Sequence, residues 1–124
     1  MKSAYVQSVS INVASGNKTT KVRILDIASG SRCRLFQVRF MPASFGGTID
    51  NDGAGMDVFS GSSGPRVYGC FSEPDRYATS GSYNHIKGMI FLDIPPSGIL
   101  VNDDVYVQGV GLGINYASIT YQVG

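Results

Sequence analysis

Charged residues are scarce in this chain: only 15% of its 124 residues are Asp, Glu, Lys or Arg. Ten Lys and Arg stand against nine Asp and Glu, which leaves a formal net charge of +1. A near-neutral surface has no electrostatic attraction to a nucleic-acid backbone or to an anionic membrane. The composition therefore predicts that neither nucleic acid nor a membrane is the primary partner.

Long apolar runs are also missing. No segment approaches the roughly 20 consecutive apolar residues of a membrane-spanning helix. The first residues, Met1–Tyr5, lead directly into an alternating segment with no apolar core of a secretory signal. We therefore expect synthesis and folding in a cytoplasm.

Histidine and cysteine are too few for the common catalytic and metal centres. His85 is the single histidine, and Cys33 and Cys70 are the two cysteines. A Ser-His-Asp or Cys-His site would have to use His85, and no Gly-x-Ser-x-Gly motif accompanies it. A structural zinc site needs more Cys and His ligands than these. We predict a non-enzymatic protein without a cofactor, whose two cysteines are free thiols in a reducing cytoplasm rather than a disulfide.

The pattern that is present is apolar–polar alternation with a period of two, in many short segments. In Ser8–Val13 the apolar residues Val9, Ile11 and Val13 face one way and the polar residues face the other, as in a half-buried strand. Sixteen glycines supply turn conformations between such segments. The predicted strands are Ser8–Val13, Thr19–Ile27, Arg32–Phe40, Met56–Phe59, Pro65–Phe71, His85–Ile94, Ile99–Val101, Val105–Val110 and Ile114–Val123.

Eight or nine short strands with turn signals between them predict an all-β antiparallel sandwich or barrel. We favour one sandwich domain over residues 1–124, because no linker or internal repeat is visible. The third segment changes phase: Cys33 and Leu35 share one face, whereas Phe36, Val38 and Phe40 follow the other. This change predicts a β-bulge near Leu35-Phe36.

Two loops could bind an ion. The run Asp50-Asn51-Asp52-Gly53, with Asp57 nearby, gathers the hard oxygens that calcium prefers, so Asp50, Asp52 and Asp57 are candidate metal ligands. The run lacks the closing Glu of a helix-flanked calcium loop, and the same residue types are ordinary turn formers. The segment Gly109–Gly113 resembles a phosphate loop only superficially, since no helix follows. It predicts a tight or bulged hairpin, and Asp103-Asp104 predicts another hairpin turn.

Aromatic residues in polar surroundings are candidates for binding. Tyr77 and Tyr83 lie in a polar loop, where tyrosine can stack on sugars or serve a protein interface, and we favour the interface. The complete set of candidate interface residues is Phe45, Tyr77, Tyr83, Tyr106 and Tyr116.

The C-terminal quarter resembles a known group of proteins. The segment Gly98–Val107, a glycine-rich turn, and Ile114–Tyr121 are similar to the ending of small virion proteins of tailed bacteriophages, namely decoration (cement) and head-fibre subunits. This chain has Asp103-Asp104 where those proteins often have Asp-Gly. The resemblance implies a jelly-roll-like sandwich, a homotrimer, binding to the major capsid protein or another virion protein, and a location on the capsid surface.

The sequence thus predicts a structural virion protein that oligomerises and decorates a phage head. The alternative is a carbohydrate-binding module or lectin-like domain, in which the Asp50–Asp57 loop could hold calcium. An enzyme on a jelly-roll scaffold is disfavoured, because such enzymes usually use several histidine metal ligands.

Overall fold

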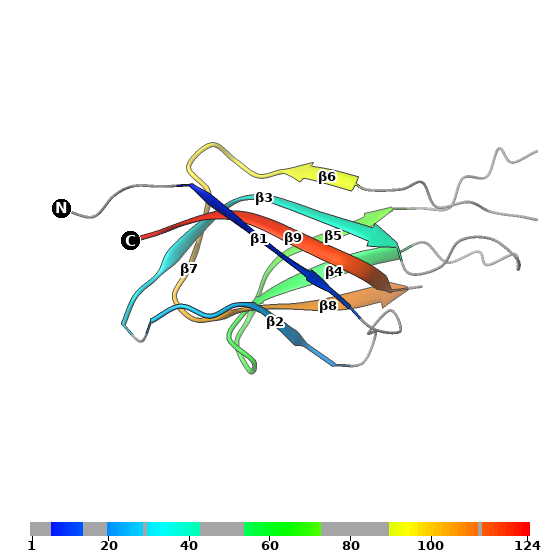
Figure 1. Cartoon of the computed structure of the whole chain (residues 1–124), viewed down its shortest axis with the longest axis horizontal. Coiled ribbons are helices and arrows are strands. Elements are labelled where there is room, and N and C mark those ends of the chain that lie inside the picture. Colours follow the sequence, from blue (N-terminus) through cyan, green and yellow to red (C-terminus); the bar gives the residue numbers. More distant parts are fainter. Residues whose placement is uncertain (1–5, 14–19, 29, 43–53, 73–89, 112) are drawn as a thin grey trace, which may run out of the picture.

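The computed structural model describes residues 6–13, 20–28, 30–42, 54–72, 90–111 and 113–124 (Figure 1). These residues contain no helix long and apolar enough to cross a membrane. They form nine strands: β1 (Gln7–Asn12), β2 (Val22–Leu25), β3 (Cys33–Pro42), β4 (Ala54–Ser60), β5 (Arg66–Ser72), β6 (Ile90–Asp93), β7 (Ile99–Val101), β8 (Val105–Gly111) and β9 (Ile114–Val123).

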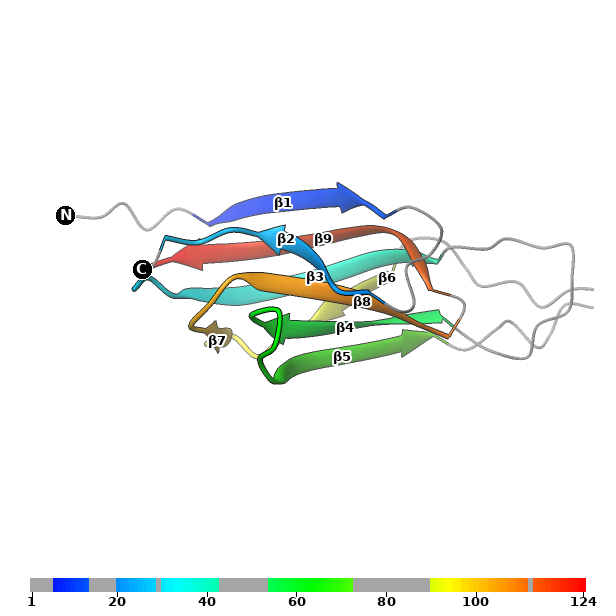
Figure 2. The same ribbon diagram turned by 90° about the horizontal axis from the view of Figure 1, so that it is seen from below.

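The strands make two antiparallel sheets that face each other (Figure 2). The first sheet has the order β1-β9-β3-β6, with β7 also paired to β3, and the second has the order β2-β8-β4-β5. Successive strands therefore alternate between the sheets, except that β4 and β5 form a hairpin in the second sheet and β6 and β7 both belong to the first. This is the strand order of a jelly roll, an eight-stranded double sheet. The predicted all-β, jelly-roll-like sandwich is confirmed.

One edge of the first sheet is a strand in two pieces. β6 pairs with β3 from Phe40↔Ile90 to Gln37↔Asp93, and β7 continues along the same strand from Leu35 to Cys33. Between them Pro95-Pro96-Ser97-Gly98 leaves the ladder, since proline has no N–H to donate. The segment closes as a turn in which Gly98 adopts a φ of 76° and donates its N–H to the Pro95 carbonyl at 2.7 Å.

The predicted bulge in β3 is confirmed. Opposite β9, the partners of β3 change register between Leu35 and Gln37, so that Phe36 is the extra residue. Because of this shift, both Leu35 and Val38 reach the core, where each has no exposed surface, while Phe36 stays half-buried. The bulge resolves the change of phase seen in the sequence.

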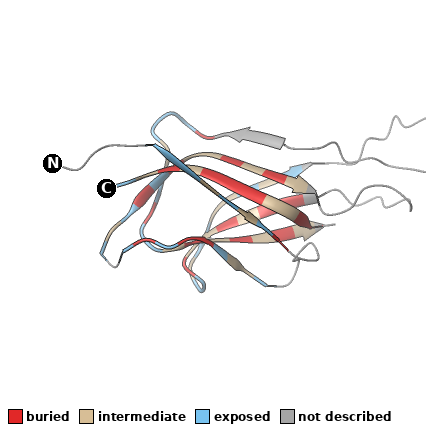
Figure 3. Cartoon of the chain, viewed as in Figure 1, coloured by how far each residue is buried: buried red, intermediate tan, exposed pale blue. Residues whose placement is uncertain are grey.

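The core lies between the sheets and receives the inward residues of both (Figure 3). Cys33 on β3 is buried in it, whereas Cys70 on β5 is half-buried in the opposite sheet. Both are free thiols, as expected. Burial raises the pKa of Cys33 to about 11 and that of Cys70 to about 12, so both side chains are neutral near pH 7.

The two predicted hairpins are wrong, although their turns exist. Gly113 has a φ of 85° and donates its N–H to the Val110 carbonyl at 3.0 Å, yet the strands on either side, β8 and β9, belong to different sheets. Asp103-Asp104 likewise joins β7 in the first sheet to β8 in the second. Turn residues specify a chain reversal, but the packing of the flanking strands decides whether they pair or separate.

Candidate functional site

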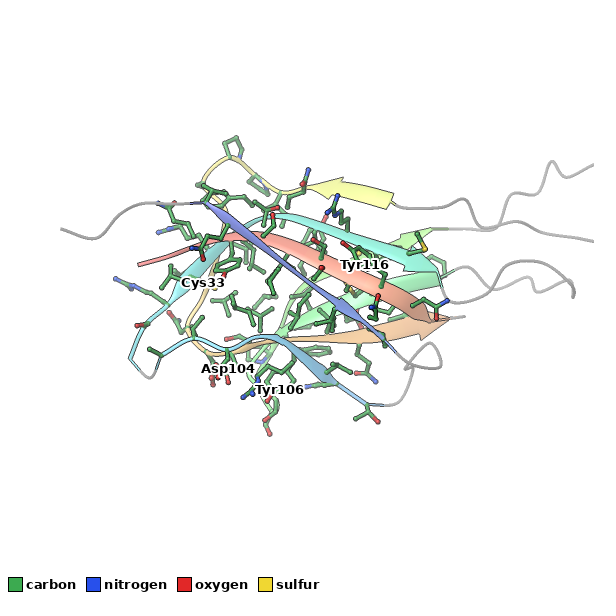
Figure 4. All side chains as sticks on the ribbon, in the orientation of Figure 1. Cys33, Asp104, Tyr106 and Tyr116 are labelled. Carbon is green, nitrogen blue, oxygen red and sulfur yellow. The ribbon has the colours of Figure 1, made fainter. Side chains whose placement is uncertain are left out.

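Those of the predicted site residues that the structure describes do not form one surface. Phe45, Asp50, Asp52, Tyr77 and Tyr83 lie outside the described residues, as does His85. Of the others, Tyr106 is on β8 and Tyr116 is on β9, so these two belong to opposite sheets (Figure 4). Both point away from the core: Tyr106 lies between the buried Val105 and Val107, and Tyr116 precedes the buried Ala117. The molecule therefore presents two separate outer faces.

The outer face of the first sheet is rich in hydroxyl groups. Ser10 on β1, Ser118 on β9 and Arg39 on β3 stand side by side in register across three strands. Tyr116 joins this row: a hydrogen bond with Ser10 is the main cause that lowers its pKa, and Ser118 and the charge of Arg39 act in the same direction. One row further along, the hydroxyls of Ser8 and Thr120 are 3.1 Å apart. On this face, polar side chains of neighbouring strands hydrogen-bond to one another.

The outer face of the second sheet is hollowed. Asp57 on β4 lies opposite Gly69 on β5, and Gly55 lies opposite Phe71 and, on its other side, Val110 of β8. Residues opposite one another in antiparallel strands share a face. These residues point outward, because Met56 and Val58 between them are fully buried. The hollow has a volume of about 320 Å³ and is lined by Asp57, Arg66, Gly69, Cys70, Phe71 and Val110.

An ion pair forms one wall of this hollow. Nη1 of Arg66 donates to Oδ1 of Asp57 at 3.4 Å, with the Arg66 side chain 62% exposed and that of Asp57 24% exposed. The pair is possible because a register shift between Val58 and Phe59 brings Arg66 beside Asp57. The Asp57 carboxylate thus already has a cationic partner. Within the described ranges no three Asp, Glu, His or Cys side chains gather to hold a metal.

Phe71 forms the opposite rim, and its ring lies against a glycine. A Cβ at Gly55 would overlap the Cys70 carbonyl oxygen and would lie 2.7 Å from Cδ1 of Phe71. Because Gly55 has no side chain, the Phe71 ring can pack closely against this position. The ring nevertheless stays 53% exposed, which makes it an exposed apolar group beside a charged pair.

The same outer face continues toward β2 with aromatic and cationic groups. Tyr106 lies opposite Phe59 on one side and Arg23 on the other. Nζ of Lys21 is 3.8 Å from the centre of the Phe59 ring and donates to the Ser62 carbonyl at 3.0 Å. This is a cation–π contact on a half-exposed ring.

Asp104 ties three segments together at the end of this sheet (Figure 4). Its Oδ1 accepts the N–H of Ile27 at 2.9 Å, its Oδ2 is 3.5 Å from Nη1 of Arg23, and its carbonyl accepts the N–H of Gly61 at 2.7 Å. The segment after β2, the β4–β5 turn and the β7–β8 connection are thus joined. Sequence reasoning assigned Asp103-Asp104 to a turn and missed this junction.

The hollow was also missed from the sequence, apart from Asp57. Arg66, Gly69 and Phe71 lie on one short strand, and an available signal was the glycine inside an otherwise apolar and aromatic run. Asp57 and Arg66 are neighbours only through the strand register, which the sequence does not state.

No protein-family model and no curated protein matches this chain. Among solved structures, the chain is similar to the Drosophila NLP core, which is described in connection with pentamer formation and histone binding: identity is 10%, the match covers 97% of this chain and 98% of the other, and the TM-score is 0.40. It is also similar to a VP2 subviral particle of infectious bursal disease virus (11% identity, TM-score 0.30) and to that virus's Gx strain (9%, TM-score 0.28).

Each viral match covers 97% of this chain but only 30% and 29% of the VP2 and Gx-strain chains, respectively. At such identities and TM-scores these neighbours do not identify a family or an activity. The jelly-roll description rests on the strand order of the two sheets.

Proposed function

We propose that this chain is a non-enzymatic structural subunit of a virus particle, which self-associates and binds the particle surface. In its specific form, the proposal is a homotrimeric decoration protein on the head of a tailed bacteriophage, bound to the major capsid protein. The jelly-roll strand order is the observation that carries the proposal, since viral capsid domains commonly have this architecture. The C-terminal sequence resemblance supports the same assignment.

The surface offers contacts on two sides. Large apolar side chains are exposed at both: Leu100 (38%) belongs to β7 of the first sheet, and Phe71 (53%) belongs to β5 of the second. Exposed apolar residues supply the contact area of protein interfaces, and a decoration subunit needs one interface with its copies and one with the capsid. We assign these two tasks to the two different sheets.

Two measurements on the full chain test the proposal. Light scattering after size-exclusion chromatography should give a defined oligomer, expected to be a trimer. Co-sedimentation should show binding to assembled capsids and not to free capsid subunits. A stable monomer that does not sediment with capsids would overturn the proposal.

The calcium-assisted lectin remains an untested prediction, because Asp50 and Asp52 lie outside the described residues. Asp57, the third candidate ligand, is paired with Arg66. A titration with calcium, followed by the change in thermal unfolding temperature, checks it directly.

A further inference from the structure

The hollow on the second sheet places three kinds of chemistry next to one another. Phe71 offers an exposed aromatic surface, Asp57 offers a carboxylate, and Arg66 offers a guanidinium. All three residues lie on two neighbouring strands of a regular sheet, β4 and β5. Their backbone positions are therefore fixed by the ladder, as a preformed binding site requires.

Gly69 forms the floor between them. Its backbone is not left-handed, so no turn geometry requires glycine at this position. A Cβ there would lie 3.0 Å from Oδ1 of Asp57 and 3.5 Å from Nη1 of Arg66. A glycine inside a strand weakens the strand and often marks a place where a ligand or another backbone approaches closely. Because Gly69 has no side chain, no atom at this position covers the polar atoms of Asp57 and Arg66.

The charges of the site favour a neutral ligand. Asp57 and Arg66 cancel each other's charge, so the pair does not select an anion or a cation. Within the described ranges, the contact between them joins Oδ1 of Asp57 to Nη1 of Arg66, whereas a carboxylate has two acceptor oxygens and a guanidinium has five N–H donors. Acceptors and donors therefore both lie within one small area. A ligand with adjacent hydroxyl groups, each of which donates and accepts, matches this arrangement.

We propose that this hollow binds one neutral sugar ring of a glycan, without a metal ion. The Phe71 ring packs against the apolar C–H face of the sugar, the Asp57 carboxylate accepts hydrogen bonds from its hydroxyls, and the Arg66 guanidinium donates to their oxygens. The volume of about 320 Å³ lies at the small end of ligand pockets, roughly 300–1,000 Å³, which suits a single ring. This inference does not rest on the proposed virion role, and it uses no residue of the predicted calcium loop except Asp57.

Amide-resolved NMR of the ¹⁵N-labelled full chain tests the proposal. The probes are the methyl glycosides of glucose, galactose and mannose and N-acetylglucosamine, each titrated to about 50 mM, since single sugar rings bind with millimolar affinity. We expect at least one of them to shift the amides of Gly69, Phe71 and Val110 in a saturable way. The shifts should be the same with and without EDTA. No saturable shift with any probe, or a shift that EDTA abolishes, would overturn the proposal.

Three variants and one control locate the site. Phe71→Ala should weaken binding by about tenfold through loss of the aromatic surface. Asp57→Asn should weaken it through loss of a charged acceptor, and Gly69→Val should abolish it by filling the floor. Val123→Ala removes an exposed apolar side chain from the other sheet and should leave binding unchanged. Unaltered binding in both Phe71→Ala and Gly69→Val would contradict the assignment.

The same samples separate this inference from the proposed function. Folding of each variant is checked by the dispersion of its NMR spectrum, and oligomeric state and capsid binding are measured in parallel. A chain that decorates capsids but shifts with no sugar would overturn only the glycan site. A chain that binds sugar but stays monomeric and ignores capsids would overturn only the virion role.

Discussion

The two outer faces of this sandwich share one backbone plan and differ in chemistry. On the first sheet, Ser10, Ser118 and Tyr116 hydrogen-bond across strands and occupy one another's polar groups. On the second sheet, the Phe71 ring packs over Gly55, and Gly69 lines a hollow beside which an ion pair and this aromatic ring stay accessible. The inward residues of both sheets pack into one core, so the outward residues can differ between the sheets. We therefore place the proposed sugar binding on the outer face of the second sheet, where Gly69 lines the hollow.

The largest effect is expected from a substitution in the core, which supports both sheets. Phe40 on β3 is the largest of the fully buried side chains in the described ranges. Phe40→Ala should lower the free energy of unfolding by about 3–5 kcal/mol, through lost burial and the cavity left behind. Chemical denaturation measures this change. If the loss were below about 1 kcal/mol, the shared core would not be what holds the two faces together.

A smaller change should act on the second sheet more than on the first. Asp104→Ala removes the acceptor of the Ile27 N–H and the partner of Arg23. We expect a loss of about 1–3 kcal/mol, because a part-buried backbone donor is left without its bond. Hydrogen exchange should accelerate at Ile27 and in β2 before it does in β9. Equal acceleration in β2 and β9 would show that the junction is not local to its sheet.

The two thiols report how readily each sheet opens. Cys33 is fully buried in the first sheet, whereas Cys70 is half-buried on the edge strand β5 of the second. At pH 8 a disulfide reagent should modify Cys70 before Cys33 and both slowly, because their raised pKa values, about 12 and 11, keep the reactive thiolate rare. Single Cys→Ser variants assign the two phases. If the reagent modified Cys33 before Cys70, the first sheet would open more readily than the second.

These raised pKa values also set a pH dependence. A thiol whose pKa is higher in the folded than in the unfolded chain adds stability that is present below the unfolded value and is lost as the pH rises toward 11 and 12. Stability should therefore fall on the alkaline side, and the Cys33→Ser variant should show a shallower fall. Denaturation midpoints between about pH 8 and 11 check this.

The smallest effect concerns the hydroxyl-rich face. The pKa of Tyr116 is lowered, first by Ser10 and then by Ser118 and Arg39, so Tyr116 should ionise below the ordinary tyrosine range. A lowered pKa adds stability above the unfolded value, and this contribution is lost as the pH falls through the folded value. Ultraviolet titration should show an early-ionising tyrosine that disappears in Tyr116→Phe and moves upward in Ser10→Ala. An unchanged titration curve in Tyr116→Phe would contradict this.

Local patterns predicted the strands better than their partners. Ile99–Val101 and Ile114–Val123 were expected with the bounds that the structure gives, and the change of phase at Leu35-Phe36 located the bulge. These features follow from alternation, which each strand carries in its own residues. The assignment of strands to sheets does not, because Gly109–Gly113 would look the same between paired strands as between sheets.

The candidate site was less predictable for the same reason. Asp57 was singled out for calcium, but its neighbour Arg66 is brought to it by the pairing of β4 with β5 and by the register shift at Val58/Phe59. Tyr106 and Tyr116 were grouped by residue type, whereas alternation and topology place them on opposite sides of the molecule. A surface site depends on contacts between strands, which a single sequence states only indirectly.

The interrupted strand formed by β6 and β7 has a consequence for how molecules of this kind can accumulate. A continuous open edge accepts the strand of a neighbour and can pass the pairing on to the next molecule without limit. At this edge the turn around Pro95-Pro96 divides the available ladder into pieces of four and three residues. At this edge a neighbouring strand could therefore pair only with short pieces, so the interruption favours association through the side-chain faces of the sheets over strand addition.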